Sequence, residues 1–228
     1  MNSWILKLQE TFIETGYDQL MLKGLKNTVI LTLGALCIGV FLGMLIAIIK
    51  NFSEGVPVLK PFAVFCDIYV TVIRGVPVVV LLLIFYFVIL ASADGITVGI
   101  LAFGINSSAY VAELIRSGLN AVDHGQTEAG RSLGLSRFQT MRRIVLPQAM
   151  RYILPAIGNE MIALLKETSV AGYVAVIDLT RAGNLVRNNT YDAINPLLIV
   201  AVTYLIMVIL LTQLLKLIEG RLRKHDHR

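Results

Sequence analysis

Four long stretches without a charged residue constrain this chain more than any other feature. They cover residues 28–49, 75–93, 95–112 and 193–215, and each is 18 to 23 residues long. A helix that crosses a bilayer needs about 20 apolar residues. Hydrophobic residues make up 56% of the chain and charged residues only 15%, against about 25% charged in a typical soluble domain. The sequence therefore predicts an all-α integral membrane protein.

The net charge of +5 does not indicate nucleic-acid binding. The basic residues lie in short loops between apolar runs, as in membrane proteins, and form no basic stripe interleaved with aromatics. Cys37 and Cys66 lie inside apolar segments without metal-ligand spacing. No metal site and no catalytic residue is expected, and the three histidines all lie outside the spanning runs.

The hydropathy pattern predicts about five transmembrane helices. We expect them at residues 21–49, 58–91, 96–117, 148–165 and 193–217. The second stretch is interrupted at residues 74–77, because Pro77 removes a backbone hydrogen bond and disfavours helical geometry at Val76. It is therefore either one kinked crossing, which we favour, or two short helices.

Arginine placement predicts the orientation. Six arginines lie between residues 116 and 151, and the tail after residue 215 is also basic, so both segments are expected in the cytoplasm. With five crossings, the N-terminus lies outside. Residues 1–19 carry Ile5, Leu8 and Phe12 at helical spacing and predict an amphipathic interfacial segment. A transmembrane domain over residues 20–220 and a basic cytoplasmic tail over 221–228 follow.

The loop at residues 118–147 predicts two short helices. Thr127 is a plausible N-cap for a helix over 127–133, which Gly134 would end, and Ser136 could cap a second helix through Arg143. Pro147 would open the next crossing. The apolar residues of this loop suit either a docking element or a connector on the lipid headgroups.

The same loop resembles the EAA motif of bacterial ABC importer permeases. Residues 128–130 are Glu-Ala-Gly; three residues then precede Gly134, and nine more precede the Ile-Val-Leu-Pro of residues 144–147. The spacing matches throughout, and Gly130 replaces the second alanine. The motif residues expected to couple to an ATPase are Glu128, Ala129, Gly130, Gly134, Leu135, Ile144, Leu146 and Pro147.

The resemblance covers residues 20–220 and is strongest to the polar amino-acid permeases of that superfamily. It rests also on the Arg-Gly-Val-Pro of residues 74–77, on residues 109–116 and on residues 164–169. Thr71 and Val76 depart from this pattern, because many relatives carry Glu and Thr there. The family implies a MetI-like ABC importer permease fold in the bacterial inner membrane.

That family also implies partners. A second permease subunit, identical or a close paralogue, an ATPase subunit bound through the Glu128 loop, and an extracytoplasmic solute-binding protein are expected. The chain has no Walker phosphate loop, so it is not expected to be an enzyme. It needs no cofactor of its own, and ATP and magnesium would bind the partner ATPase.

Charged and polar residues in the spanning helices are the candidate substrate contacts. Glu160, beside Asn159, could hold an ammonium group or a cationic side chain. The structural alternative for Glu160 is an interhelical hydrogen bond or a partnership with Arg74 or Lys166. Arg74 could meet a carboxylate or act as a structural lock.

Two further residues complete this set. Asn106 is expected to face the bundle with the two serines after it, lining the path or joining helices. Asp67, expected near-buried, could pair with a lysine or add to an electronegative cavity with Glu160, favouring arginine, lysine or histidine as substrate. Lys166 and Glu167 are expected to end the fourth helix near the outer face. Residues 169–186 are expected to form a half-buried outer element that gates the path or contacts the binding protein.

The sequence thus predicts the permease of an ATP-driven importer of a polar, basic amino acid. The alternative is an ion-coupled secondary transporter, which would need two internal halves with matching broken helices. No such repeat is visible in the sequence.

Overall fold

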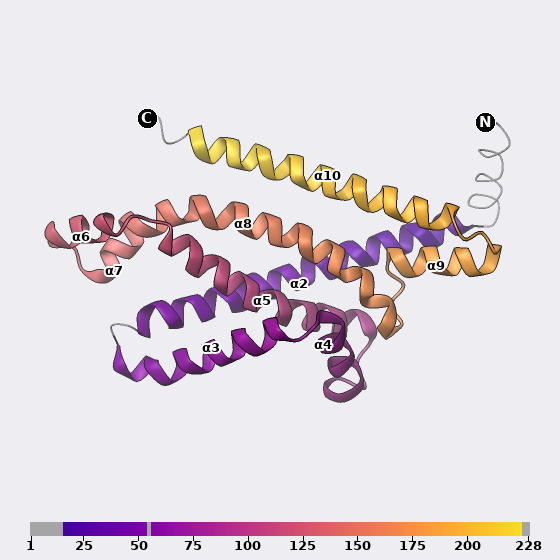
Figure 1. The fold of residues 1–228 in the computed structure, drawn as a ribbon, viewed down its shortest axis with the longest axis horizontal. Coiled ribbons are helices and arrows are strands. Elements are labelled where there is room, and N and C mark those ends of the chain that lie inside the picture. Colours follow the sequence, from indigo (N-terminus) through magenta and orange to yellow (C-terminus); the bar gives the residue numbers. More distant parts are fainter. Residues whose placement is uncertain (1–15, 54–55, 225–228) are drawn as a thin grey trace. The chain divides into compact units, whose positions relative to one another are not determined.

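The computed structural model describes residues 16–53 and 56–224, with side chains through residue 220. These residues form α-helices joined by short 3-10 and π segments, without a strand among them. Figure 1 shows the α-helices: α2 (Tyr17–Ser53), α3 (Lys60–Gly75), α4 (Val78–Ile84), α5 (Gly95–Asn120), α6 (His124–Ser132), α7 (Arg137–Thr140), α8 (Leu146–Glu167), α9 (Leu179–Thr190) and α10 (Asn195–Lys224). The short segments are η2 (Pro57–Leu59), η3 (Phe85–Ile89), η4 (Met141–Val145) and η5 (Thr168–Val174). The predicted all-α class is confirmed.

Three of the described helices are long and apolar enough to cross a membrane. They are α2, α5 and α10, and the broken pair α3–α4 makes a fourth if it counts as one span. The remaining predicted crossing, at residues 148–165, corresponds to α8, which is 22 residues long. It is less apolar than the other three because it carries Arg151, Asn159 and Glu160.

The predicted break before Pro77 is confirmed. Helix α3 ends at Gly75, and Pro77 has an extended ψ of 135° at the start of α4. Because proline has no N–H and disfavours helical geometry in the residue before it, the helix cannot run through this point. The pair is one broken span or a re-entrant loop.

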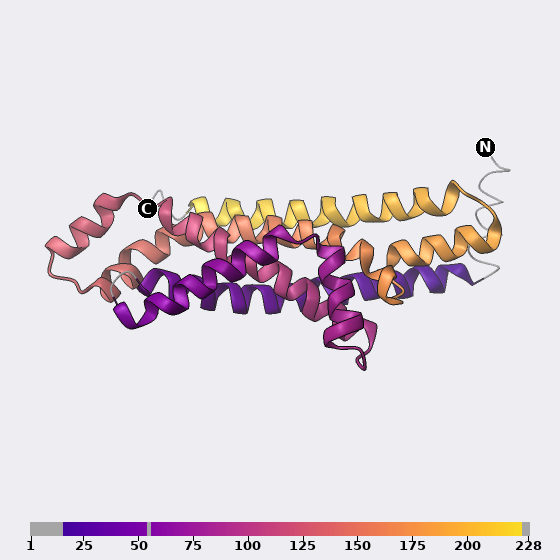
Figure 2. The ribbon, with the colours of Figure 1, turned by 60° about the horizontal axis from the view of Figure 1, so that its bottom comes forward.

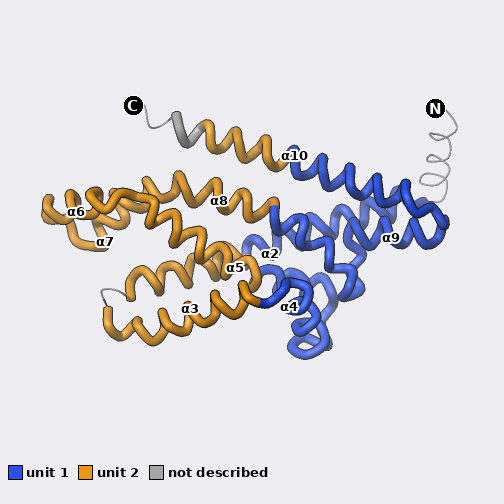
Figure 3. The backbone as a smooth tube through the Cα atoms, in the orientation of Figure 1, with its two compact units in different colours: residues 1–37, 76–104, 163–210 blue, residues 38–75, 105–162, 211–228 orange. Residues whose placement is uncertain are grey.

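The chain forms two compact units, coloured in Figure 3. Unit 1 holds the described residues up to 37 with 76–104 and 163–210. Unit 2 holds residues 38–75, 105–162 and the described residues from 211 on. The interfacial segment predicted at residues 1–19 lies almost wholly outside the described residues. The side chains of the predicted basic tail lie outside them too.

Unit 1 is built around two apolar clusters. One has Phe103 and Leu164 fully buried at its centre. The other packs Met21 of α2 against Leu179 of α9 and Val200 of α10. Figures 1 and 2 both show the start of α2, α9 and the start of α10 side by side. Gly24 permits this approach, because a Cβ there would lie 2.7 Å from the carbonyl oxygen of Asp178.

Unit 2 packs α2, α5 and α8 around Val111, Ile115 and Ile153. Glycines let α2 and α5 approach closely. A Cβ on Gly39 would lie 2.8 Å from Ser107, and a Cβ on Gly43 would lie 2.8 Å from Val111. Contacts between small residues are typical of helix pairs in membranes.

Candidate functional site

The Glu160 carboxylate contacts Ser107 in unit 2. The Ser107 hydroxyl donates a hydrogen bond to Oε1 of Glu160 over 2.9 Å. Ser107 is fully buried on α5, and Glu160 is half-buried on α8. The interhelical hydrogen bond considered for Glu160 from the sequence is therefore present. An ionised carboxylate offers about four acceptor sites, so one hydroxyl donor does not exclude a ligand there.

The residues on either side of Ser107 are also buried. Asn106 is 3% exposed, and Ser108 is fully buried. The Ser108 hydroxyl lies 2.7 Å from the Tyr69 hydroxyl, which also donates to the Ile105 carbonyl over 3.2 Å. The expected polar interior face of this helix is confirmed, and Tyr69 joins α3 to it.

Arg74 and Asn159 occupy other positions of unit 2. The Arg74 guanidinium lies 5.2 Å from the centre of the Tyr110 ring, a cation–π contact that joins the end of α3 to α5. Arg74 and Asn159 are both exposed in the isolated chain. Their proposed substrate contacts stay predictions.

Asp67 is not near-buried as the sequence suggested. Its side chain is 58% exposed and forms an ion pair with Lys50 over 2.5 Å. The predicted alternative of a lysine partner is confirmed. Asp67 lies on the exposed side of α3 beside Phe65 and Ile68, both more than half exposed, whereas Cys66 faces inward. The helical period, rather than the surrounding apolarity, decides its burial.

Helix α6 is the first helix of the loop at residues 118–147, which is the predicted coupling loop, but it does not begin at Thr127 as predicted. It begins at His124 and is capped by Asp123, whose carboxylate accepts from the Gly125 N–H over 2.7 Å. Aspartate is a stronger N-cap than threonine, so the helix starts at the residue after Asp123. Thr127 lies one turn inside.

Gly134 ends α6 as predicted. Its φ is +81°. The Leu135 N–H donates to the Gly130 carbonyl over 3.2 Å, and the Gly134 N–H donates to the Arg131 carbonyl over 3.0 Å. These two bonds form a Schellman motif, which requires the left-handed conformation that glycine adopts without strain.

The second loop helix starts as predicted but does not stop at Arg143. Ser136 and Gln139 form a complete capping box for α7. The backbone then continues through the π turn η4 directly into α8, which begins at Leu146. Pro147 is the second residue of α8, and because the helix continues from η4, its missing N–H removes a backbone hydrogen bond to the preceding turn.

The structure explains why glycine occupies position 130. This residue is buried, and a Cβ there would lie 2.7 Å from Cγ2 of Thr140 and 2.9 Å from Cδ1 of Ile144. Among the described side chains, Thr140 carries a buried hydroxyl without a hydrogen-bond partner. Alanine at position 130 would therefore displace Thr140 or Ile144 and is not a neutral replacement.

The other loop residues divide into an exposed and a packed set. Glu128 and Ala129 are exposed, and Leu133 is 81% exposed. Ile144 and Leu135 are half-buried, and Leu146 is 40% exposed. Exposed Glu128 and Leu133 offer a surface for a partner, while Ile144 holds the loop together.

The half-buried element expected at residues 169–186 consists of η5 and most of α9, and α8 ends at Glu167 as expected. Asp178 is fully buried there and caps α9 by accepting from the N–H groups of Thr180 and Arg181 over 2.9 and 3.2 Å. Burial raises the pKa of the Asp178 carboxyl, and these hydrogen bonds act in the opposite direction. The sequence signal for this residue was an aspartate directly before a helix.

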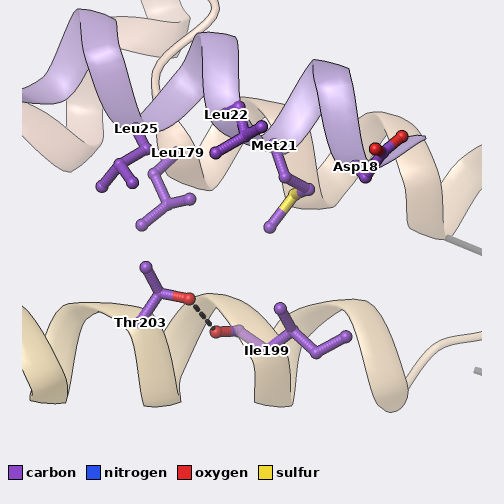
Figure 4. Close-up of a pocket in the computed structure, with 7 residues that line it drawn as sticks. All are labelled: Asp18, Met21, Leu22, Leu25, Leu179, Ile199 and Thr203. Carbon is purple, nitrogen blue, oxygen red and sulfur yellow. Dashed lines mark hydrogen bonds between the residues drawn. The ribbon is translucent and has the colours of Figure 1, made fainter. Parts of the chain in front are cut away.

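Unit 1 also contains an apolar pocket of about 390 Å³ between α2, α9 and α10, drawn in Figure 4. Met21, Leu22 and Leu25 line one side, and Thr203 of α10 donates its hydroxyl to the Ile199 carbonyl over 2.7 Å. Asp18 is the one charged residue in its lining. This lining does not suit a polar solute.

Comparisons with known proteins agree with one another. Residues 39–224 match the family described as the binding-protein-dependent transport system inner membrane component. The chain is 36% identical over 192 residues to the putative glutamine transport system permease protein GlnP of Rickettsia typhi, covering 82% of this chain and 86% of that protein. It is 34% identical over 210 residues to the arginine transport system permease protein ArtQ of Bacillus subtilis, covering 90% and 94%.

Solved structures share the fold. One described as an amino acid ABC transporter with histidines has a TM-score of 0.84 and 41% identity, covering 91% of this chain and 96% of that one. The MetNI methionine ABC transporter in an inward-facing conformation has a TM-score of 0.78 at 20% identity, which supports the fold alone.

Proposed function

Because the chain belongs to the family of binding-protein-dependent transport system inner membrane components, we propose that it is the permease subunit of an ATP-driven importer that carries a basic amino acid into the cytoplasm. Relatives named for glutamine and arginine transport support an amino-acid substrate. The alternative of an ion-coupled secondary transporter is not favoured by this family.

The observation that carries the substrate class is the Glu160 carboxylate on α8. A charge in a membrane helix is costly and faces the bundle interior or a water-filled path. The Ser107 hydroxyl donates a hydrogen bond to it and fixes its position on the inner side of α8. A carboxylate at this depth attracts the ammonium or guanidinium of a basic amino acid, so we expect the substrate to bind here.

In this proposal the neighbours of Glu160 have distinct roles. Asn106 and Asn159 line the path beside the carboxylate and Arg74 meets the substrate carboxylate, while Asp67, which is exposed and paired with Lys50, takes no part. Residue placement allows this for Arg74, because its contact with Tyr110 is through the ring face and leaves guanidinium N–H donors for a carboxylate.

Energy enters through the loop in this proposal. Helix α6 presents Glu128 and Leu133 to a separate ATPase subunit, which binds ATP and magnesium. A second permease subunit, identical or closely similar, completes the path, and an extracytoplasmic binding protein delivers the amino acid to η5 and α9. The six arginines at residues 116–151 support a cytoplasmic loop, and in this proposal the C-terminus is cytoplasmic too and the N-terminus lies outside.

The test is transport by the complete complex in vesicles. We would reconstitute the chain with its ATPase and binding protein and measure ATP hydrolysis and uptake for each amino acid. Arginine, lysine or histidine is expected to stimulate both. Hydrolysis indifferent to every amino acid would refute an amino-acid importer.

Glu160→Gln tests the site separately. Uptake of the basic amino acid should fall at least about tenfold, because loss of one buried charge contact costs 1.5 kcal/mol or more, while assembly with the ATPase is unchanged. Glu219→Gln, an acid of α10 away from Ser107, is the matched control. Uptake equal to that of the Glu219 variant would contradict the role of Glu160.

A further inference from the structure

Unit 2 contains a second apolar cavity, of about 430 Å³, next to the coupling loop. Most of its lining belongs to the predicted spanning helices, with Met44 and Ile48 from α2, Ile115 from α5, and Met150 and Ile157 from α8. The loop contributes Phe138, Met141 and Arg142. A cavity of this size lies in the range that binds small molecules and single chains rather than whole protein elements.

The lining is apolar except at one end. Arg142 is its one charged residue, and no acidic residue lines the cavity. Arg137 donates a hydrogen bond to the carbonyl of Asn51, another lining residue, over 3.3 Å, so a second guanidinium lies beside the cavity. The nearby acid Asp67 is already paired with Lys50. The chemistry therefore suits an amphiphile with a long apolar chain and an anionic head.

We propose that this cavity binds one acyl chain of an anionic glycerophospholipid, with the headgroup phosphate at Arg142. Basic pockets between membrane helices bind such headgroups, and methionine side chains such as Met44, Met141 and Met150 adapt to a flexible chain. The bilayer around α2 and α8 supplies the ligand at high concentration. Because Phe138 and Met141 line the cavity, the bound chain also supports the coupling loop.

The experiment uses the transporter assembled with its partners in phosphatidylcholine vesicles. A trace of phosphatidylglycerol or phosphatidylcholine carries a diazirine at the end of one acyl chain, and the adducts are mapped after irradiation by mass spectrometry. Phosphatidylglycerol should label Met150 or Ile157 about five times more than phosphatidylcholine, which is the effect of one arginine near the surface. Free glycerol phosphate should not displace it.

Arg142→Gln should lower phosphatidylglycerol labelling to the level of phosphatidylcholine. Arg143→Gln is the matched control, because Arg143 is the exposed neighbour that does not line the cavity. Equal labelling by the two lipids, or labelling no stronger than at exposed Leu205 and Leu210 of α10, would overturn the proposal. Crosslinks from cavity residues to the ATPase or to a second permease would overturn it too, since a protein would then fill the cavity.

Discussion

Ser107 and Glu160 are joined by a hydrogen bond of 2.9 Å, although 53 positions separate them in the sequence. The bond ties α5 to α8 in unit 2 and orients the carboxylate. Gly39 of α2 packs against the same serine, where a Cβ would lie 2.8 Å from its side chain. The orientation of Glu160 therefore depends on three helices.

We expect Ser107→Ala and Glu160→Gln to be non-additive. Hydrogen bonds to charged groups contribute about 1.5–3 kcal/mol, so the double variant should lose clearly less stability than the sum of the single variants. Thermal unfolding of the purified protein in detergent measures this cycle. Ser108→Ala is the control, because Ser108 contacts Tyr69, and its loss of stability should add to that of Glu160→Gln. If the losses of Ser107→Ala and Glu160→Gln also added, the contact between Ser107 and Glu160 would be contradicted.

Gly130→Ala should destabilise the coupling loop although it restores the family motif. Alanine gains about 1 kcal/mol in helix propensity, but overpacking against Thr140 and Ile144 costs about 1–3 kcal/mol. Thr140→Ala removes both the clashing methyl group and the unpartnered hydroxyl. The double variant should therefore be at least as stable as the parent, and the proposal of a steric conflict fails if Thr140→Ala gives no rescue.

Gly134→Val should release the ATPase subunit, whereas Gly134→Asn should retain it. The φ of +81° costs a β-branched residue about 1–2 kcal/mol, while asparagine tolerates this conformation. Co-purification of the ATPase at increasing salt compares the two variants. Equal retention would mean that the Schellman motif does not hold the docking surface.

Asp178→Asn should make stability less dependent on pH. Burial raises the folded-state pKa of Asp178, so the folded protein favours the protonated carboxyl. The stability of the parent should fall relative to the asparagine variant as the pH rises from the unfolded value, near 4, through the folded pKa. Asparagine keeps the N-cap. Parallel melting curves between pH 4 and 7 would contradict this prediction.

The long helices could be predicted because apolar runs and prolines determine helix formation within a few residues of themselves. The break at Pro77 and the capping box at Ser136 follow from the nearest few residues. Asp67 was misplaced because a short apolar run does not say which side of α3 faces inward. The prediction of Thr127 as the N-cap did not weigh Asp123, which precedes the helix and is the stronger capping residue.

The contacts within the candidate site could not be predicted from patterns of neighbouring residues in the sequence. Glu160 was identifiable as a charge in a membrane helix, but its partner Ser107 lies on another helix. Whether Gly130 is a tolerated or a required glycine depends on Thr140 across the loop. Tertiary packing decides both.

The backbone passes from α7 through η4 into α8 without a break, so the loop and α8 are joined by continuous helical structure. The docking loop and the Glu160 carboxylate share one backbone, about 20 Å apart at 1.5 Å per residue. Pro155 lies between them inside α8 and removes the hydrogen bond to the carbonyl one turn before it. A displacement of the loop would therefore reach Glu160 through Pro155, which lies less than two turns before Glu160. The helix bends most easily at this proline.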